Sequence, residues 1–268
     1  MTPSELRRQC REGLHTSLTS GCCPGYAQAN LVILHAKVAA DFEQLCRENP
    51  VPIPLIGKTE VGNPHRLTDQ NVIHDTELDL TRDFPKYLVY ENGKLVAAPT
   101  DISSIWQDDH VGFLIGCSYL FDTALTRAGL GPRNLAENKN VSMYITNQRL
   151  RDSGVFVNVP YVVSMRPYRE ADISRVSEIT SLFTKTHGAP IAYGYDAAER
   201  LGIVDLEKPD FGDQTIIHPD EVPVFWGCGV TAQLAALSIH DIIEGPIIGH
   251  APGHMLVTDL RDEDVTES

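Results

Sequence analysis

The sequence predicts an α/β protein, with a mixed central sheet flanked by helices and a smaller α+β unit. Apolar runs of strand length alternate along the chain with stretches of helical spacing. Hydrophobic residues make up 42% of the chain and charged residues 22%, as in globular proteins. The 268 residues correspond to one large domain or two modest ones. We expect a main domain over residues 1–135 and 190–268, and the smaller unit over 136–189.

Two helices are predicted at the start of the chain. Thr2-Pro3-Ser4-Glu5 is typical of a helix start, and Gly13 ends this first helix. Residues 26–48 are predicted to form the second helix, because their apolar side chains recur three and four positions apart. Asn49-Pro50 ends it.

A hairpin and a series of strands and helices follow. Asn92-Gly93 lies between two apolar runs and favours a type I′ turn, so a hairpin is predicted over residues 87–97. Strands are expected at 111–115, 155–159, 161–165, 191–193, 203–206, 222–226, 247–249 and 255–260. Helices are expected at about 118–130, 171–186, 196–201 and 231–240.

The charge balance restricts the partners of this protein. Lys and Arg number 22 against 36 Asp and Glu, which gives a formal net charge of −14. Such an acidic protein is repelled by nucleic-acid phosphates and by anionic membranes, so neither is an expected partner. A small carboxylate remains an expected partner, because local groups decide its binding, and a homo-oligomer remains open.

The cysteines and the N-terminal segment indicate a cytoplasmic protein. No two of the six cysteines form a CxxC pair, and no Cys/His spacing matches a zinc site. The N-terminus lacks the apolar core of a signal peptide. We therefore expect reduced thiols, no cofactor and no metal site, although a divalent metal requirement stays open.

Two similar segments are candidates for the binding site. Gly116-Cys117-Ser118 and Gly227-Cys228-Gly229 each follow an apolar strand and precede a helix. Free backbone N–H groups at a helix start can bind an anion, and a thiol there has a lowered pKa. Cys117 and Cys228 are thus candidate catalytic residues, and the flanking Gly116, Ser118, Gly227 and Gly229 candidate substrate ligands. Alternatively, both cysteines are small apolar residues that fill space under tight turns.

Two histidines and one aspartate are candidates for proton transfer. His187 and His250 lie on segments rich in Gly and Pro, which hold the backbone on a fixed path. Asp205 lies beside a predicted strand and is a candidate base or orienting group. The alternatives are helix capping or surface exposure for the histidines, and turn capping for Asp205.

Further polar residues are candidate substrate ligands. Arg166 follows a predicted strand, where its guanidinium could bind a carboxylate with two hydrogen bonds or form an ordinary surface ion pair. The remaining candidates are Tyr26, Gln28, Asn30 and Thr231. GxSxG, Walker, HExxH and GxGxxG patterns do not occur, so serine-hydrolase and nucleotide chemistry have no support.

Several ordered segments together resemble a known family. They are Pro24-Gly25-Tyr26-Ala27-Gln28-Ala29-Asn30, Ile115-Gly116-Cys117-Ser118, Ser164-Met165-Arg166-Pro167, His187-Gly188-Ala189-Pro190, Gly202-Ile203-x-Asp205-Leu206 with Pro209-Asp210-x-Gly212, Pro223-Val224-Phe225-Trp226-x-Cys228-Gly229-Val230-Thr231-x-Gln233 and His250-Ala251-Pro252-Gly253-x-Met255. On these segments the chain is similar to the D-glutamate cyclase-like family of hydro-lyases. The resemblance implies a two-part α/β architecture without a nucleotide cofactor, and a lyase that removes water. The family's reference reaction is the cyclisation of D-glutamate to 5-oxo-D-proline.

The leading hypothesis is therefore a hydro-lyase that acts on a small amino- or hydroxy-carboxylate. Such a reaction needs a base, an acid for the departing hydroxyl, and N–H or cationic groups for the carboxylate. Two alternatives remain open. One is a non-catalytic module that binds a small carboxylate, and the other is a racemase or epimerase that uses the two cysteines as bases.

Overall fold

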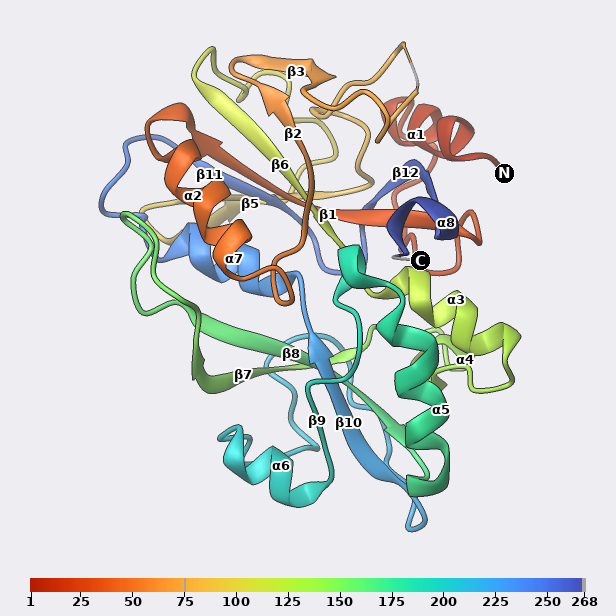
Figure 1. Cartoon of the computed structure of the whole chain (residues 1–268). Helices are drawn as coiled ribbons and strands as arrows, with labels where there is room; N and C mark the ends of the chain where they lie inside the picture. The colour runs from red at the N-terminus through yellow and green to blue at the C-terminus, as the bar shows by residue number, and fades with distance from the viewer. Residues whose placement is uncertain (75, 267–268) are drawn as a thin grey trace.

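The chain folds into two antiparallel β-sheets with helices packed against them. The computed structural model describes residues 1–74 and 76–266. In Figure 1 the eight-stranded sheet occupies the upper half of the molecule and the four-stranded sheet the lower half. The predicted α/β class is confirmed. The described strands pair antiparallel rather than in the parallel βαβ manner that alternating strands and helices favour.

The larger sheet is built from both ends of the chain. Its strand order is β3-β2-β6-β1-β11-β4-β5, and β12 also pairs with β1. The strands are β1 (Tyr26–His35), β2 (Leu55–Glu60), β3 (Asn63–Leu67), β4 (Tyr87–Glu91), β5 (Lys94–Ala97), β6 (His110–Gly116), β11 (Ile247–His250) and β12 (Leu256–Arg261). The helices attached to it are α1 (Pro3–Arg11), α2 (Ala36–Glu48), α7 (Val230–Leu237) and α8 (Asp262–Val265).

The predicted helix over residues 26–48 is wrong in its first half. Residues 26–35 form β1, which pairs with β6 on one edge and with β11 and β12 on the other. All residues from Ala27 to Leu34 are buried, so both faces of the strand are covered. A continuous apolar run suits a fully buried strand as well as a buried helix, and spacing alone does not separate the two. The helix begins after His35, whose Nδ1 accepts a hydrogen bond from the Lys37 N–H.

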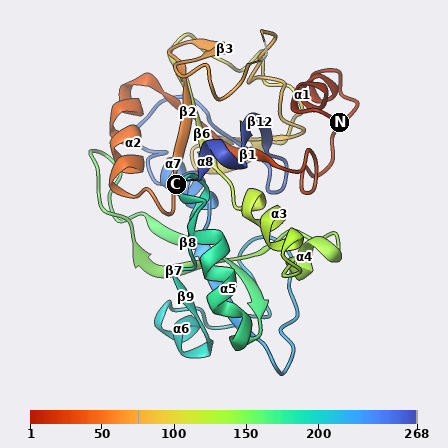
Figure 2. The same ribbon diagram turned by 45° about the vertical axis from the view of Figure 1, so that its right-hand side comes forward.

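The smaller sheet has the order β7-β8-β10-β9 and draws strands from both sides of residue 189. Its strands are β7 (Ser142–Arg149), β8 (Pro160–Tyr168), β9 (Ala192–Tyr193) and β10 (Val222–Gly227). Its helices are α3 (Tyr119–Arg127), α4 (Arg133–Ala136), α5 (Glu170–Ser181) and α6 (Tyr195–Arg200), and a 3-10 turn covers Thr184–Thr186. α3 and α5 lie side by side against this sheet (Figures 1 and 2).

Two predicted strands are absent from the described structure. Residues 155–159 form a loop that carries Phe156 into the core, where burial rather than strand pairing explains the apolar run. Residues 203–206 lie in a turn region, and the Val204 side chain is 99% exposed to solvent. The predicted first helix and the hairpin are confirmed. Asn92 and Gly93 both have positive φ, 50° and 73°, as a type I′ turn requires.

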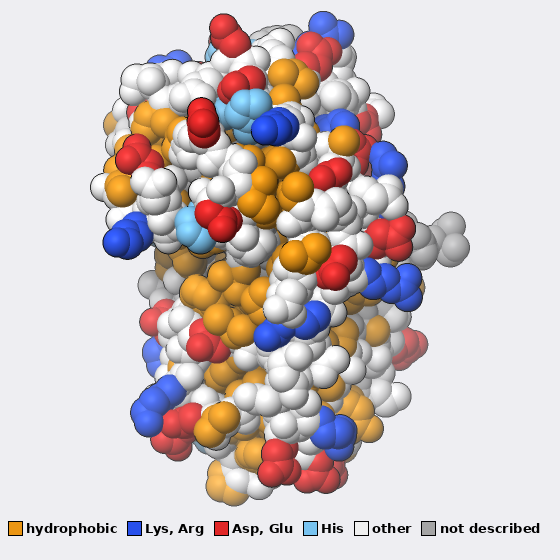
Figure 3. All heavy atoms as spheres, turned by 90° about the vertical axis from the view of Figure 1, so that its left-hand side faces the viewer, with side chains coloured by type: hydrophobic (Ala, Val, Ile, Leu, Met, Phe, Trp, Pro, Cys, Tyr) orange, Lys and Arg blue, Asp and Glu red, His pale blue; other side chains and the backbone are white. Residues whose placement is uncertain are grey.

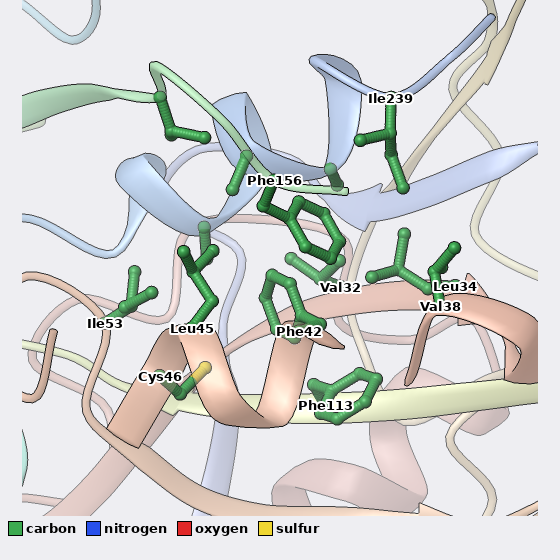
Figure 4. Close-up of a cluster of buried hydrophobic side chains, with 14 of the residues drawn as sticks. Val32, Leu34, Val38, Phe42, Leu45, Cys46, Ile53, Phe113, Phe156 and Ile239 are labelled. Carbon is green, nitrogen blue, oxygen red and sulfur yellow. The ribbon is translucent and has the colours of Figure 1, made fainter. Parts of the chain in front are cut away.

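The largest core cluster joins α2, β6 and the 150–159 loop. The rings of Phe42, Phe113 and Phe156 meet edge to face, with centroid distances of 4.8 Å and 5.4 Å from Phe42 to the other two (Figure 4). This cluster ties the larger sheet to a loop between two strands of the smaller one. Outside the core, charged side chains of both signs are scattered over the face drawn in Figure 3, and hydrophobic side chains gather across its middle. None of the described helices combines the length and the apolar composition needed to cross a bilayer.

Candidate active site

The two Gly-Cys segments form equivalent strand-to-helix junctions. The first connects β6 to α3 and the second connects β10 to α7. Ser118 and Gly229, the residues that precede the two helices, have the same conformation, with φ of −62° in both and ψ of −13° and −16°. Each sheet thus contributes one helix start. At the start of α7, the N–H groups of Thr231 and Ala232 already donate to the Cys228 and Gly229 carbonyls, each at 3.0 Å.

A small cavity lies where these two junctions meet. Its volume is about 30 Å³, enough for a water molecule or two. Seven of the predicted site residues line it: Asn30, Cys117, Ser118, His187, Cys228, Gly229 and His250. Sequence reasoning missed Tyr119, Asn140, Val141, Met143, Val230, Pro252, Gly253 and Met255, which complete the lining. Tyr119 could have been predicted, because it follows Ser118 at a helix start. Asn140 could not, because it comes to the cavity from a segment distant in the sequence.

His187 lines the cavity in an unusual backbone conformation. Its φ is +84°, in the left-handed region that a non-glycine residue rarely occupies. The side chain is 2% exposed, and Nδ1 lies 2.8 Å from the Val51 carbonyl oxygen. Since a carbonyl only accepts, Nδ1 carries the proton of the neutral ring and Nε2 is left as an acceptor. Burial lowers the pKa of His187 to about 4, so the ring is neutral at pH 7.

His250 has the opposite arrangement of its ring nitrogens. It ends β11, is 4% exposed, and its Nδ1 accepts a hydrogen bond of 3.1 Å from the Leu31 N–H. The proton of the neutral ring is therefore on Nε2, which makes this nitrogen a donor. Burial also lowers the pKa of His250 to about 4. One neutral imidazole thus offers a lone pair and the other offers an N–H.

The pKa values of the Cys117 and Cys228 thiols are raised, not lowered as the sequence predicts. Burial raises the pKa of Cys117 to about 12 and that of Cys228 to about 11. The backbone N–H groups of Tyr119 and Val230 act in the opposite direction but are outweighed. Both cysteines are therefore neutral thiols at pH 7, because desolvation exceeds the stabilisation from the helix start.

The glycines of the junctions make room for neighbouring protein atoms. A Cβ on Gly116 would overlap the Lys185 carbonyl oxygen, and one on Gly229 would overlap the Asn30 side-chain amide. A Cβ on Gly227 would lie 2.9 Å from the Val51 carbonyl oxygen and 3.2 Å from His187 Nδ1. The absent side chains therefore let the two halves of the site pack closely, and Gly116 and Gly227 do not themselves line the cavity.

Arg166 lies behind the cavity wall. It is fully buried and forms an ion pair with Asp122, with 2.8 Å between Nε and Oδ1. Its terminal nitrogens donate to Ser118 Oγ at 2.9 Å and to Ser164 Oγ at 3.0 Å, and its guanidinium lies over the Phe121 and Trp226 rings. Because the Ser118 oxygen accepts from Arg166, the hydroxyl hydrogen of Ser118 is directed elsewhere. Arg166 thus contacts the site through Ser118.

Two other polar candidates hold the backbone near the site. Gln28 donates to the Thr19 carbonyl at 2.8 Å and accepts from Thr19 Oγ1 at 2.9 Å. Thr19 Oγ1 also accepts from the Met255 N–H, so this pair supports the 250–255 segment. Thr231 Oγ1 accepts from the Val162 N–H at 3.0 Å and joins α7 to β8.

The last two candidates lie away from the cavity. Asp205 is part of a turn, with its carboxylate on the Glu207 N–H and 3.0 Å from Lys208 Nζ. Tyr26 contacts Arg261, whose guanidinium donates to the Tyr26 hydroxyl at 3.1 Å. Within residues 1–74 and 76–266, no group of three His, Cys, Asp or Glu side chains is placed to hold a metal ion.

Comparison with known proteins identifies the family. The model of the family described as D-glutamate cyclase matches residues 111–259, more than half of the chain and both Gly-Cys junctions. The chain belongs to the D-glutamate cyclase family. The family segment also includes His187 and His250, the two histidines of the cavity.

Relatives in this family match almost the full chain. A protein of Rubrobacter xylanophilus named "Putative hydro-lyase" is 46% identical over 97% of this chain and 96% of its own length. "Putative hydro-lyase YcsI" of Bacillus subtilis is 45% identical over 98% of both chains. "Putative hydro-lyase C5H10.01" of Schizosaccharomyces pombe is 44% identical over 96% of this chain and 84% of its own length. Among solved structures, a nitrogen repressor-like protein from Methanococcus jannaschii aligns at 11% identity with a TM-score of 0.39, too low to inform fold or function.

Proposed function

We propose that the two Gly-Cys junctions and the residues around the cavity between them form the active site of a hydro-lyase for a small amino- or hydroxy-carboxylate, and that the lining moves apart to admit the substrate, because the cavity of about 30 Å³ holds only a water molecule or two. One observation carries the proposal: His187 and His250 line the same cavity, both buried and neutral, with opposite proton arrangements. At pH 7 the lone pair of His187 Nε2 can accept a proton, and the N–H of His250 Nε2 can donate a hydrogen bond to a departing oxygen, as an elimination of water requires. The names of the relatives support the same class of reaction.

In a dehydration, the substrate would lose a C–H proton to His187 Nε2. The hydroxyl on the adjacent carbon would accept a hydrogen bond from the His250 Nε2–H and would leave as water with the proton that His187 has taken, so that a C–H and a C–O bond break, a C=C bond forms, and both imidazoles end neutral. The substrate carboxylate would accept hydrogen bonds from the N–H groups at the starts of α3 and α7 and from the Ser118 hydroxyl.

D-Glutamate is the substrate that the family description suggests. In this case the amine must lose a proton to His187 before its nitrogen attacks the γ-carboxyl carbon. The C–N bond forms, the nitrogen loses a second proton, and the two protons pass to one carboxyl oxygen, which leaves as water and gives 5-oxo-D-proline. The same base and acid would serve both reactions.

The test is proton NMR in deuterated buffer with D-glutamate, with 5-oxo-DL-proline, and with a series of small hydroxy acids. We expect loss of water from at least one compound, and at least a tenfold lower rate, about 1.4 kcal/mol in the barrier, in His187→Gln and His250→Gln. The exposed His218→Gln is the matched control. Full turnover in both cavity variants would refute the assignment of the two histidines.

A racemase is the second candidate, because Cys117 and Cys228 line the same cavity from the two junctions. Their raised pKa values weigh against it, since a racemase base must be a thiolate in each direction. Deuterium that appears at Cα without net product, and that is lost in both Cys117→Ser and Cys228→Ser, would favour the racemase over the hydro-lyase.

A further inference from the structure

We propose that the turn between β11 and β12, residues 251–254, is the gate of this cavity, and that a ligand enters between Pro252 and Asn140. The proposal rests on the proposed function in one respect, which is that a substrate must reach the cavity. It names the part of the lining that moves, because a space of about 30 Å³ holds only a water molecule or two.

Pro252 and Asn140 mark the point where the cavity comes nearest to solvent. Both are half-buried, whereas the other lining residues in the described part of the chain are buried. Pro252 follows a strand of the larger sheet, and Asn140 precedes a strand of the smaller one. Neither residue lies within a helix or a strand, so the two can separate without breaking either sheet.

The part of the lining formed by the two Gly-Cys junctions is fixed by buried contacts. The Asn30 amide donates to the Ile115 and Gly116 carbonyls, each at 3.2 Å. Gly229 packs so closely on this amide that a Cβ there would overlap it. Asn30 thus holds both junctions together. Separating them would leave buried polar groups without partners, which makes the junctions the less movable part of the lining.

The 251–254 turn is closed by contacts that water can replace. Gly253 lies against the Asn140 side chain, since a Cβ on Gly253 would overlap Asn140 Oδ1. Thr19 holds the turn in place. Its N–H donates to the Gly253 carbonyl at 2.8 Å, and its Oγ1 accepts from the Met255 N–H at 3.0 Å. When the turn lifts toward solvent, water takes the place of these partners, and no buried group is left unpaired.

The thiols of Cys117 and Cys228 report on this gate without any ligand. Both line the cavity and are buried, so an alkylating reagent reaches them only when the cavity opens. Cys46 is buried in the core cluster around α2 and reports unfolding of the whole protein. The experiment is labelling of the native protein with iodoacetamide at about pH 8, with each labelled thiol identified by peptide mass spectrometry. We expect the two cavity thiols to react at least about tenfold faster than Cys46, as local opening requires.

Gly253→Ala tests whether the turn is the part that moves. The added methyl group and the Asn140 side chain cannot occupy the same space, so the variant should hold the turn away from Asn140. We expect labelling of the cavity thiols, relative to that of Cys46, to rise at least about tenfold. Gly129→Ala is the matched control. Its φ of +77° imposes the same backbone strain as the +78° of Gly253, and its Cβ would meet no atom of the described chain within 4 Å.

Thr19→Val tests the same gate from the other side and serves if Gly253→Ala does not fold. It keeps the size of the side chain and removes the hydroxyl that accepts from the Met255 N–H. The cavity thiols should again react faster relative to Cys46. Thr258→Val is the control, because it removes an equally buried hydroxyl from β12 at a position that does not line the cavity.

Two results would overturn the gate. One is equal labelling rates for all three buried thiols in the parent protein, because the cavity would then open only by unfolding. The other is a labelling ratio that stays unchanged in both Gly253→Ala and Thr19→Val, which would indicate that the two sheets part instead.

The labelling needs no substrate, so its outcome is separate from that of the proposed reaction. Gated access to the cavity in a protein that dehydrates none of the tested compounds would refute the proposed function and support the gate. Dehydration by a protein whose cavity thiols react only on unfolding would support the proposed function and refute the gate.

Discussion

The hydroxyl of Ser118 is positioned by a buried ion pair, Arg166 and Asp122, that does not itself line the cavity. Arg166 holds its hydroxyl oxygen, and Asp122 in turn fixes the guanidinium. The planar fork of an arginine is suited to this task because several N–H groups are set in one geometry. The position of one hydroxyl at the cavity is thus determined by two side chains in the wall behind it.

We expect Asp122→Asn to destabilise the fold by about 3–5 kcal/mol, because it leaves the fully buried Arg166 charge without its partner. Urea unfolding measures this change. Asp172→Asn is the control, since its ion pair with the exposed Arg169 lies on the surface and should cost less than about 1 kcal/mol. Equal midpoints for the two variants would refute the prediction.

At the level of single residues, sequence reasoning placed several cavity residues well but misjudged their surroundings. Cys117 and Cys228 lie at helix starts as predicted, and yet both pKa values rise, because a pattern of residues does not reveal how deeply a thiol is buried. Arg166 was expected to meet a carboxylate and does so, but the carboxylate is Asp122 of the same chain.

At the scale of helices and strands, the two strand-to-helix junctions can pack as they do only because glycine occupies their tightest positions. We expect Gly116→Ala to destabilise the protein by about 1–3 kcal/mol, because its Cβ would overlap the Lys185 carbonyl oxygen and push the 3-10 turn before His187 away. Gly57→Ala in β2 is the control, because its Cβ would meet only ordinary contacts of 3.4 Å or more. Thermal unfolding of both variants checks the difference, and a normal melting temperature for Gly116→Ala would contradict it.

Elements whose ends are set by neighbouring residues, such as a helix cap or a two-residue turn, were predicted correctly from the sequence. The Thr2 cap, the Asn92-Gly93 turn and the helices after the two Gly-Cys segments all agree with the structure. β1 was predicted as helix because its identity as a strand comes from its neighbours on both edges. For a segment that is apolar on every side, pairing with distant segments decides whether it forms a strand or a helix.

At the scale of the whole molecule, the buried guanidinium of Arg7 joins α1 to β12. Arg7 is 1% exposed, donates to the Val257 carbonyl at 2.7 Å, and forms an ion pair with Asp259 at 3.0 Å. We expect Arg7→Ala to cost about 3–5 kcal/mol of unfolding free energy. The exposed Arg8→Ala is the control, and similar denaturation midpoints for the two would show that the contact contributes little.

The buried histidines make the stability of the whole fold depend on pH. The pKa of each falls from 6.5 to about 4 on folding, so the unfolded chain binds protons more readily between these values. The stabilisation is therefore complete above about pH 6.5 and is lost as pH falls toward 4, by up to about 3 kcal/mol per imidazole. Urea unfolding across this range should show a shallower pH dependence in His250→Gln than in the parent. An unaltered slope in His250→Gln would refute the burial effect.

The composition of the cavity could not be predicted as a set. Its lining comes from β1, both junctions, the start of β7, the turn at His187 and the 250–255 segment, which lie far apart in the sequence. Spacing identifies candidates within one segment but does not say which segments meet. Nothing in the sequence around Asp205 or Asn140 says which of the two lies at the site. Folding brings Asn140 to the cavity and leaves Asp205 outside it.

The central strand of the larger sheet receives two of its partners from residues more than 200 positions further along the chain. β1 pairs along one edge with β11 and β12, which span residues 247–261. During synthesis on the ribosome, this buried apolar strand keeps an open edge until residues 247–261 have been added. At translation rates of about 5–20 residues per second, that interval lasts on the order of ten seconds or more. During this interval the open edge of β1 exposes the nascent chain to pairing with other chains, and chaperones that cover the edge would prevent it.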